Sequence, residues 1–349
     1  MSSDSQERLL LLCALHHTDH GRIDWQLLAR TAQTTAGLDQ WFDGQVPEQS
    51  AKATKSQRVL TWALRDPAAL RTAVEFVARQ LTAAEQVGAA LTTVLDTDFP
   101  ANLRLVPDAP PFLFYRGVLD PADARSIAVV GTRKATSDGR RRAARMARGL
   151  SEAGIVVVSG LAAGIDTAAH TTAVEHQHRT VAVVGTGIAS PTYPKENAAL
   201  AERIVLAGGA VVSQFWPTDP PDRWRFPARN ITMSGFSQGT VVVEASSTSG
   251  AKMQAQAAYR HAKTVFLLHS LATMQPWARQ MIDAALAEAT PPEQQLDLLD
   301  ERPTPADLPL RVVEVADVAD VVGRVATADA IQAAAELRYR LAESVPGAM

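Results

Sequence analysis

Short apolar runs alternate with helical patterns from residue 125 onwards. The apolar runs lie at 127–130, 155–159, 180–184, 210–213, 240–244, 264–268 and 311–315. Their hydrophobic residues are continuous rather than alternating, which is typical of strands covered by helices on both faces. Helical patterns separate most of them, at 139–153, 166–177, 195–207 and 249–262. This alternation predicts an extended, Rossmann-like α/β domain over residues 125–325, doubly wound and with a mainly parallel sheet.

The chain before this domain has a different pattern. Residues 1–90 are mostly helical in pattern and predict a small helical N-terminal domain, with a polar loop from Gly44 to Ser56. Residues 91–124 are rich in turn signals around one short strand, Phe112 to Arg116. We expect them to form an extended strap that leads into the main domain. Residues 326–349 are polar and alanine-rich and predict a C-terminal helix.

Composition narrows the classes of protein that fit this pattern. The 349 residues are 46% hydrophobic and 20% charged, and the net charge is −3, so any nucleic-acid site must be a local patch. The single cysteine, Cys13, excludes an internal disulfide and a multi-cysteine metal site, and we expect no metal and no cofactor. The polar N-terminus differs from a signal peptide, and no apolar run approaches membrane-spanning length. We therefore expect a cytoplasmic protein without membrane contact.

Two predicted strands end in glycine-containing loops that open into helices. The first loop is Gly131-Thr-Arg-Lys134, and the second runs from Ser159 to Gly164. Such loops present backbone N–H groups and a positive helix end to an anion. Neither a Gly-x-Gly-x-x-Gly motif nor a Walker loop is present. Arg133 either faces the anion or is a solvent-exposed arginine of the turn. Asp166 either caps the next helix or binds a ribose, and we expect its neighbour His170 to anchor that helix.

Further polar residues follow the later strands. Gly185 and Gly187 end the third strand, Arg229 and Asn230 lie just inside a helix, and Ser249-Gly250 opens another helix that carries Lys252. These positions suit phosphate or base-edge contacts. Tyr193, Trp216, Trp224 and Phe226 either stack on bases or pack against the protein. An arginine stripe at 141, 145 and 148 either follows a phosphate backbone or forms a solvated helix face.

The order of these motifs resembles one bacterial family, the DNA-processing protein A family, also called DprA or Smf. The family pattern runs Gly-Ser-Arg, Ser-Gly-x-Ala-x-Gly-Ile-Asp-x-x-Ala-His, Gly-x-Gly…Tyr-Pro-x-x-Asn, Phe-Pro-x-Arg-Asn-Arg and Val-Glu-Ala…Ser-Gly. The matching segments here are 131–133, 159–170, 185–187 with 193–197, 226–230, and 243–245 with 249–250. Together with the strap from Asp98 to Gly117, the resemblance covers about residues 90–290.

This resemblance implies a protein that binds single-stranded DNA and loads the RecA recombinase, in natural transformation (competence) or in recombinational repair. It also implies a homodimer that is not an enzyme. The loops and the resemblance together give these candidate DNA- and phosphate-binding residues: Gly131, Thr132, Arg133, Lys134, Gly160, Gly164, Gly185, Gly187, Arg229, Asn230, Ser249, Gly250 and Lys252.

The chain departs from the family pattern at several positions. Ala163 and Ile231 stand where the family has arginines. The segments 213–215 and 268–270 also differ from the family's Ser-Glu-Tyr and Val-Pro-Gly. Each lost arginine removes a phosphate contact, which weakens binding and flattens its salt dependence. We therefore expect a divergent member of the family.

Two other functions compete with DNA binding. One is a nucleotide-binding sensor, or a phosphoribohydrolase of the same fold superfamily. The hydrolase signature is only partly present, because Gly239, Thr240 and Glu244 remain while the glycine pair is missing and Glu244 lies one residue late. The other is a scaffold that has lost its ligand. The retention of Arg133, Lys134 and Arg229 argues against a scaffold, although fold alone decides none of these functions.

Overall fold

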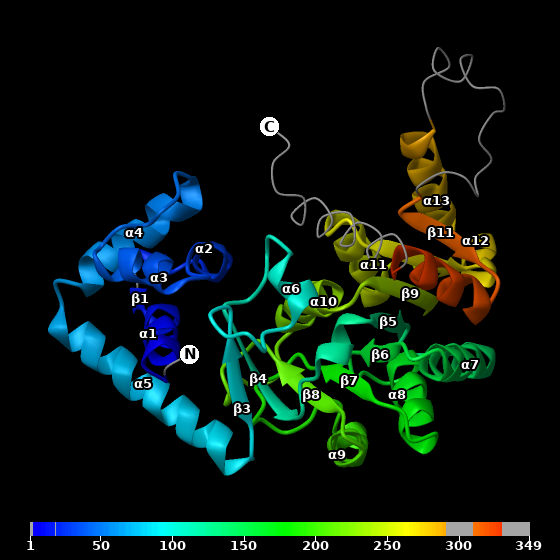
Figure 1. Ribbon diagram of the computed structural model, residues 1–349, viewed down its shortest axis with the longest axis horizontal. Helices are drawn as coiled ribbons and strands as arrows, with labels where there is room; N and C mark the ends of the chain where they lie inside the picture. Colours follow the sequence, from blue (N-terminus) through cyan, green and yellow to red (C-terminus); the bar gives the residue numbers. More distant parts are fainter. Residues whose placement is uncertain (1–2, 18, 291–309, 330–349) are drawn as a thin grey trace, which may run out of the picture.

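A nine-stranded sheet with helices on both faces forms the centre of the molecule, and a helical region packs against one end of the sheet (Figure 1). This computed structural model describes residues 3–17, 19–290 and 310–329. The strands are β3 (Ala90–Thr93), β4 (Phe112–Gly117), β5 (Ser126–Gly131), β6 (Val156–Ser159), β7 (Thr180–Val183), β8 (Ala210–Ser213), β9 (Gly239–Glu244), β10 (Thr264–Leu268) and β11 (Val312–Val315). The seven from β5 onwards coincide with the predicted apolar runs, and the α/β fold class is confirmed.

The strand order explains where a ligand site can form. The order is β11-β10-β9-β5-β6-β7-β8-β4-β3, with every pair from β11 to β8 parallel and with β4 antiparallel to both β8 and β3. The chain builds outwards from β5 through β6, β7 and β8, and then from β9 in the other direction. The direction therefore changes between β5 and β9. Ligands of such sheets bind beyond the carboxyl ends of the strands at this switch point.

Helices cover both faces of the parallel strands, as doubly wound topology requires. In Figure 1, α7, α8 and α9 lie below the sheet, and α10, α11 and α13 lie above it. The bounds of the helices in this domain are α7 (Ser137–Glu152), α8 (Ile165–Glu175), η2 (Lys195–Asn197), α9 (Ala198–Leu206), α10 (Arg225–Phe236), α11 (Gly250–Arg260), α12 (His269–Met274) and α13 (Pro276–Ala289). Because both sheet faces are covered, the strands are apolar on both sides.

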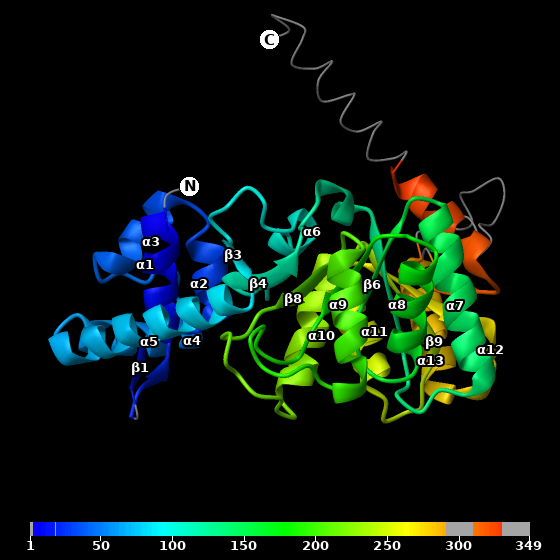
Figure 2. The same ribbon diagram turned by 90° about the horizontal axis from the view of Figure 1, so that it is seen from below.

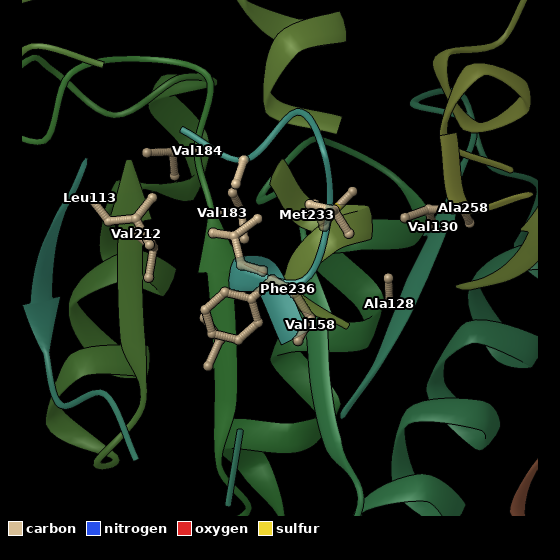
Figure 3. Close-up of a cluster of buried hydrophobic side chains, with 14 of the residues drawn as sticks. Leu113, Ala128, Val130, Val158, Val183, Val184, Val212, Met233, Phe236 and Ala258 are labelled. Atoms are coloured by element: carbon tan, nitrogen blue, oxygen red, sulfur yellow. The ribbon is translucent and has the colours of Figure 1, made fainter. Parts of the chain in front are cut away.

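The core between the sheet and α10 is built from branched side chains and one aromatic ring. Figure 3 shows Phe236 and Met233 of α10 beside Val158, Val183 and Val212, which come from three neighbouring strands. All five side chains are buried. Burial of each contributes about 1.5–3 kcal/mol to folding. This packing fixes α10 over the carboxyl ends of the strands, where its first turn enters the candidate site.

The N-terminal region is helical, as predicted. It contains α1 (Ser3–Ala14), α2 (Trp25–Thr31), α3 (Thr35–Phe42), α4 (Ala51–Ala63) and α5 (Pro67–Gln86), with two short paired strands, β1 (His16–His17) and β2 (Gly21–Arg22). The predicted loop from Gly44 to Ser56 was too long, because the Ser50 side chain accepts a hydrogen bond from the Ala53 amide and starts α4 at Ala51. Capping of this kind satisfies amides that have no partner within the helix.

An aromatic cluster joins the helical region to the sheet. The Trp216 ring centroid lies 5.9 Å from that of Trp25 in α2, 5.0 Å from Phe76 in α5 and 4.8 Å from Phe112 in β4. The Gln80 amide also donates to the Thr218 hydroxyl at 2.9 Å. Figure 2 shows the result, with β3 and β4 between the helical region and β8.

The predicted strap contributes strands to the sheet. Residues 91–124 hold most of β3, all of β4, and the short helices α6 (Ala101–Arg104) and η1 (Pro121–Ala124). The domain boundaries at 90 and 124 remain predictions. Residues 318–329 form a helix whose Asp329 accepts from Arg125 at 2.8 Å, but most of the predicted helix 326–349 lies outside the described residues. Within the described ranges, no helix is long and apolar enough to span a membrane.

Candidate functional site

A hollow of about 540 Å³ opens at the carboxyl edge of the sheet, at the switch point between β5 and β9. Its walls are the loop after β5, the start of α10, and the loop that leads from β9 into α11. We call it the switch-point hollow. The predicted site residues that line it are Gly131, Thr132, Arg133, Arg229, Asn230, Ser249 and Gly250.

Arg133 forms one wall of the switch-point hollow together with two aromatic rings. Its guanidinium carbon lies 4.8 Å from the centroid of the Phe226 ring, and that ring lies 5.4 Å from the ring of Tyr193. Arg133 is exposed, and 45% of Tyr193 is exposed. Among the described residues, no carboxylate forms an ion pair with Arg133. The wall therefore offers an unpaired cation and aromatic faces, which suit a phosphate and a base.

Arg229 occupies the floor of the hollow and is buried. Its Nη1 donates to the carbonyl of Gly160 and, at 2.6 Å, to that of Val183, while its Nε donates to the Asn230 side chain at 3.0 Å. Burial lowers the pKa of the guanidinium to about 10, although the charge of Asp166 acts in the opposite direction. Arg229 thus joins the carboxyl ends of β6 and β7. Its Nε and Nη1 are thus bonded within the protein, and a phosphate contact by Arg229 remains a prediction.

Asp166 and His170, one turn apart on α8, hold the loop after β6. The Asp166 carboxylate accepts from the amides of Gly160 and Ala162 at 3.1 and 3.3 Å, and burial raises its pKa. The Nδ1 of buried His170 lies 2.8 Å from the hydroxyl of Thr180, at the start of β7. His170 therefore anchors the helix, as predicted. Asp166 stabilises the loop, and it lines the switch-point hollow although only 4% of the residue is exposed.

The burial of His170 predicts that the protein loses stability in mild acid. Burial lowers the pKa of His170 to about 3 from an ordinary value of 6.5. Below pH 6.5 the unfolded chain gains a proton that the folded protein does not bind. Down to about pH 3, this group then lowers the free energy of unfolding by up to about 1.4 kcal/mol per pH unit. Urea unfolding between pH 7 and 5 should show this slope, and His170→Gln should flatten it.

Exposed His176, at the end of the same helix, provides the control. His176→Gln should leave the slope of the free energy of unfolding against pH as it is in the wild type. If His170→Gln and the wild type have the same slope, the buried imidazole is not the source of acid sensitivity.

Four glycines of the predicted site serve close packing. A Cβ on Gly160 would lie 2.2 Å from Arg229 Nη1, and one on Gly164 would lie 2.3 Å from the carbonyl oxygen of Thr132. Gly164 also has a φ of +85°, which side chains rarely adopt. Protein atoms similarly fill the space beside Gly185 and Gly187. These four glycines position the loops, and direct ligand contacts by them remain a prediction.

The two predicted lysines do not line the switch-point hollow. Lys134 is exposed on the loop after β5, and its backbone amide donates to the Thr132 hydroxyl at 3.2 Å. The ammonium of Lys252 lies 5.8 Å from the Trp277 ring of α13. Lys252 is thus directed away from the hollow, because the first turn of α11 places it on the side that faces α13.

The arginine stripe of α7 is partly neutralised on its own helix. Arg141 pairs with Asp138, and Arg148 pairs with Glu152 at 2.7 Å. Arg145 lines a separate hollow beside His269. Two of the three stripe arginines thus have carboxylate partners, and a phosphate track on this face remains a prediction.

Sequence reasoning missed one charged residue of the switch-point hollow. Arg223 is exposed and lines the switch-point hollow. Its signal was present in the sequence, because arginines alternate with aromatic residues from 223 to 226. Glu244 accepts from the hydroxyl of Thr136 at 2.8 Å at the start of α7 and does not line the hollow. Glu244, the acid of the partial hydrolase signature, is therefore hydrogen-bonded within the protein. The described part of the chain also holds no cluster of metal ligands.

Residues 90–300 match the model of a family described as DNA recombination-mediator protein A. That span is more than half of the chain. The chain belongs to this family. Among its relatives, the DNA processing protein DprA of Streptococcus pneumoniae strain R6 is 38% identical over 176 residues, which are 50% of this chain and 61% of that protein. Protein Smf of Synechocystis is 38% identical over 177 residues, which are 50% of this chain and 44% of that protein. The chain thus matches less than two thirds of either relative.

Solved structures of the DNA recombination-mediator protein A family share the fold. The crystal structure of DprA from Streptococcus pneumoniae aligns with a TM-score of 0.59 and 27% identity, covering 81% of this chain and 93% of that one. A Helicobacter pylori DprA structure, described for its mode of binding single-stranded DNA, aligns with a TM-score of 0.54 and 19% identity. That alignment covers 69% of this chain and 96% of the Helicobacter chain.

The two positions that lack the family's arginines lie in different surroundings. Ala163 is exposed on the loop after β6, next to Ala162, which lines the switch-point hollow. Ile231 is half-buried and lines a second hollow on the other side of α10. Of these two replacements, only the one at Ala163 therefore takes away a cation beside the switch-point hollow, and Arg133 and Arg223 remain there.

Proposed function

We propose that this protein binds single-stranded DNA in the switch-point hollow and acts as a mediator of recombination. The wall formed by Arg133, Phe226 and Tyr193 carries the proposal, because it places an unpaired cation and the exposed Tyr193 ring at the carboxyl edge of the sheet. Stacking on aromatic rings binds bases without regard to sequence, and arginine binds the phosphate next to them. Duplex DNA keeps its base faces stacked, so the hollow favours a single strand.

The family and its relatives support this proposal and extend it. The family is described as a recombination mediator, and the Helicobacter relative is described as binding single-stranded DNA. We propose further that the bound strand is passed to a RecA-type recombinase, during natural transformation or repair, by a cytoplasmic homodimer. In this proposal the protein has no catalytic step of its own. Engagement of Glu244 by Thr136 supports that part.

A nucleotide-binding sensor is the second candidate function. The hollow volume of about 540 Å³ falls within the range of small-molecule sites. Binding experiments separate the two candidates, because a sensor binds a mononucleotide tightly and gains little from a longer strand. Thermal-shift measurements with mononucleotides test the sensor directly.

Arg133→Ala should lower the affinity for single-stranded DNA by about tenfold. It should also reduce the steepness of log affinity against log salt concentration by about one. The physical reason is the loss of one cation next to the bases. Fluorescence anisotropy with labelled single strands of about 30–60 nucleotides, at several salt concentrations and against duplex of equal length, measures both quantities. Wild-type protein should prefer the single strand.

Arg148→Ala is the matched control for this variant. It changes the net charge by the same amount, but Arg148 lies on α7 and pairs with Glu152. Its effect on affinity should be small. Equal affinities of Arg133→Ala and wild type would contradict the proposed site. Recombinase assembly on a strand coated with single-strand-binding protein then tests mediation, which wild type should accelerate and Arg133→Ala should not.

A further inference from the structure

A second hollow, of about 570 Å³, lies between the N-terminal helical region and α10. We call it the junction hollow. Arg22 of β2 and Lys52 and Lys55 of α4 line it from the helical region. Phe215, Trp224 and Ile231 line it from the main domain. Both parts of the chain are therefore needed to form it.

Trp224 is an exposed aromatic ring in the junction hollow. About half of the residue, 48%, is exposed. The guanidinium carbon of Arg225 lies 5.0 Å from the ring centroid and that of Arg22 lies 6.0 Å from it. The Phe215 ring meets it edge-on at 5.8 Å and supports it. An indole held in place, with cations close by and one part open, suits the stacking of a base.

Two cations of the junction hollow are available to bind phosphates. Among the described residues, Arg22 and Lys55 have no ion-pair partner. The two carboxylates of the hollow are already bonded. Asp24 caps α2 and pairs with Lys52 at 3.2 Å, and Asp108 lies 2.6 Å from the imidazole of His261. Three cations and two carboxylates line the hollow, so it keeps a net positive charge beside an aromatic face.

The start of α10 separates the junction hollow from the switch-point hollow. Arg223 and Phe226 line the switch-point hollow, whereas their neighbour Trp224 and the later Ala228 line the junction hollow. A single strand that crosses the first turn of α10 would meet both sets of residues in succession. The two hollows are neighbours, because residues within one turn of this helix line both of them.

We propose that the junction hollow is a second contact region for the same single strand, with a base stacked on Trp224 and phosphates beside Arg22 and Lys55. This inference rests on the proposed function of the switch-point hollow. It gives the N-terminal helical region a direct part in DNA binding. It also predicts that affinity depends on strand length, because a short strand fills one hollow and a longer strand fills both.

Full-length protein and two oligothymidylates, of about six and about twenty nucleotides, test this inference by fluorescence anisotropy. Trp224→Ala should weaken binding of the long strand by at least about fivefold and leave binding of the short strand unchanged. Trp224→Phe keeps an aromatic face and should restore most of the affinity. Thermal melting checks that each variant is folded.

Lys55→Gln and Arg58→Gln form a matched pair on α4. Both remove one positive charge, but Lys55 lines the junction hollow and Arg58 does not. Only Lys55→Gln should reduce the affinity for the long strand and its dependence on salt. Equal effects of the two would point to general electrostatic attraction and overturn the inference.

The outcomes separate this inference from the proposed function. If wild type binds neither strand, the proposed function fails. If wild type binds both strands and Trp224→Ala binds the long one equally well, only the second contact region fails. If Trp224→Ala weakens both strands by the same factor, Trp224 supports the shape of α10 rather than a second region, and the inference is likewise overturned.

Discussion

Arg229→Ala is expected to lower the free energy of unfolding by about 3 kcal/mol or more. The substitution leaves the carbonyls of Gly160 and Val183 without a donor in a buried place. It also leaves the buried Asp166 carboxylate without the nearby positive charge. Urea unfolding followed by circular dichroism measures the change. DNA affinity should fall as well, because the loops that shape the switch-point hollow lose their common anchor.

Arg229→Lys separates charge from geometry at this position. A lysine keeps the positive charge but not the planar fork that reaches both carbonyls and the Asn230 side chain. It should therefore recover only part of the lost stability. A double variant, Arg229→Met with Asp166→Asn, removes both charges and should be more stable than Arg229→Met alone. If Arg229→Ala unfolds at the same urea concentration as wild type and loses only DNA affinity, the residue is a ligand contact, as the sequence predicted.

The sequence predicts the parallel half of the fold well for a physical reason. Strands buried on both faces must be apolar throughout, so β5 to β11 stand out as continuous runs between helical patterns. The antiparallel end is harder to predict. β3 reads Ala-Leu-Thr-Thr, which is not a continuous apolar run, and its pairing with β4 brings together segments about twenty residues apart along the chain. Turn signals alone do not reveal such pairing.

The candidate site was predictable in place but not in the roles of its side chains. Arg133 follows a strand directly, so its position at the carboxyl edge follows from the topology. Arg229 lies inside a helix, where a small rotation decides whether a side chain is buried or free, and packing of Phe236 and Met233 sets that rotation. Lys252 was assigned to the site by its motif, yet Trp277 lies beside its ammonium. Motif spacing does not contain this tertiary information.

Trp216→Ala should have the second large effect, at the junction of the helical region and the sheet. Trp216 is 8% exposed and contacts Trp25, Phe76 and Phe112. Removing a buried aromatic ring of this size costs about 3–5 kcal/mol, because a cavity replaces it. Since these partners come from α2, α5 and β4, the loss falls on the contact between the two parts. Limited proteolysis should then cleave the connection between α5 and β3 faster than in wild type.

Trp277→Ala provides the matched control, because Trp277 is also buried but belongs to α13, at a distance from the junction. Both variants should unfold at lower urea concentrations than wild type. Only Trp216→Ala should expose the connection between α5 and β3 to protease. Equal cleavage in the two variants would mean that other contacts, such as the hydrogen bond between Gln80 and Thr218, hold the helical region in place. Faster cleavage in Trp216→Ala alone would show that the aromatic cluster fixes the position from which Arg22 and Lys55 face α10.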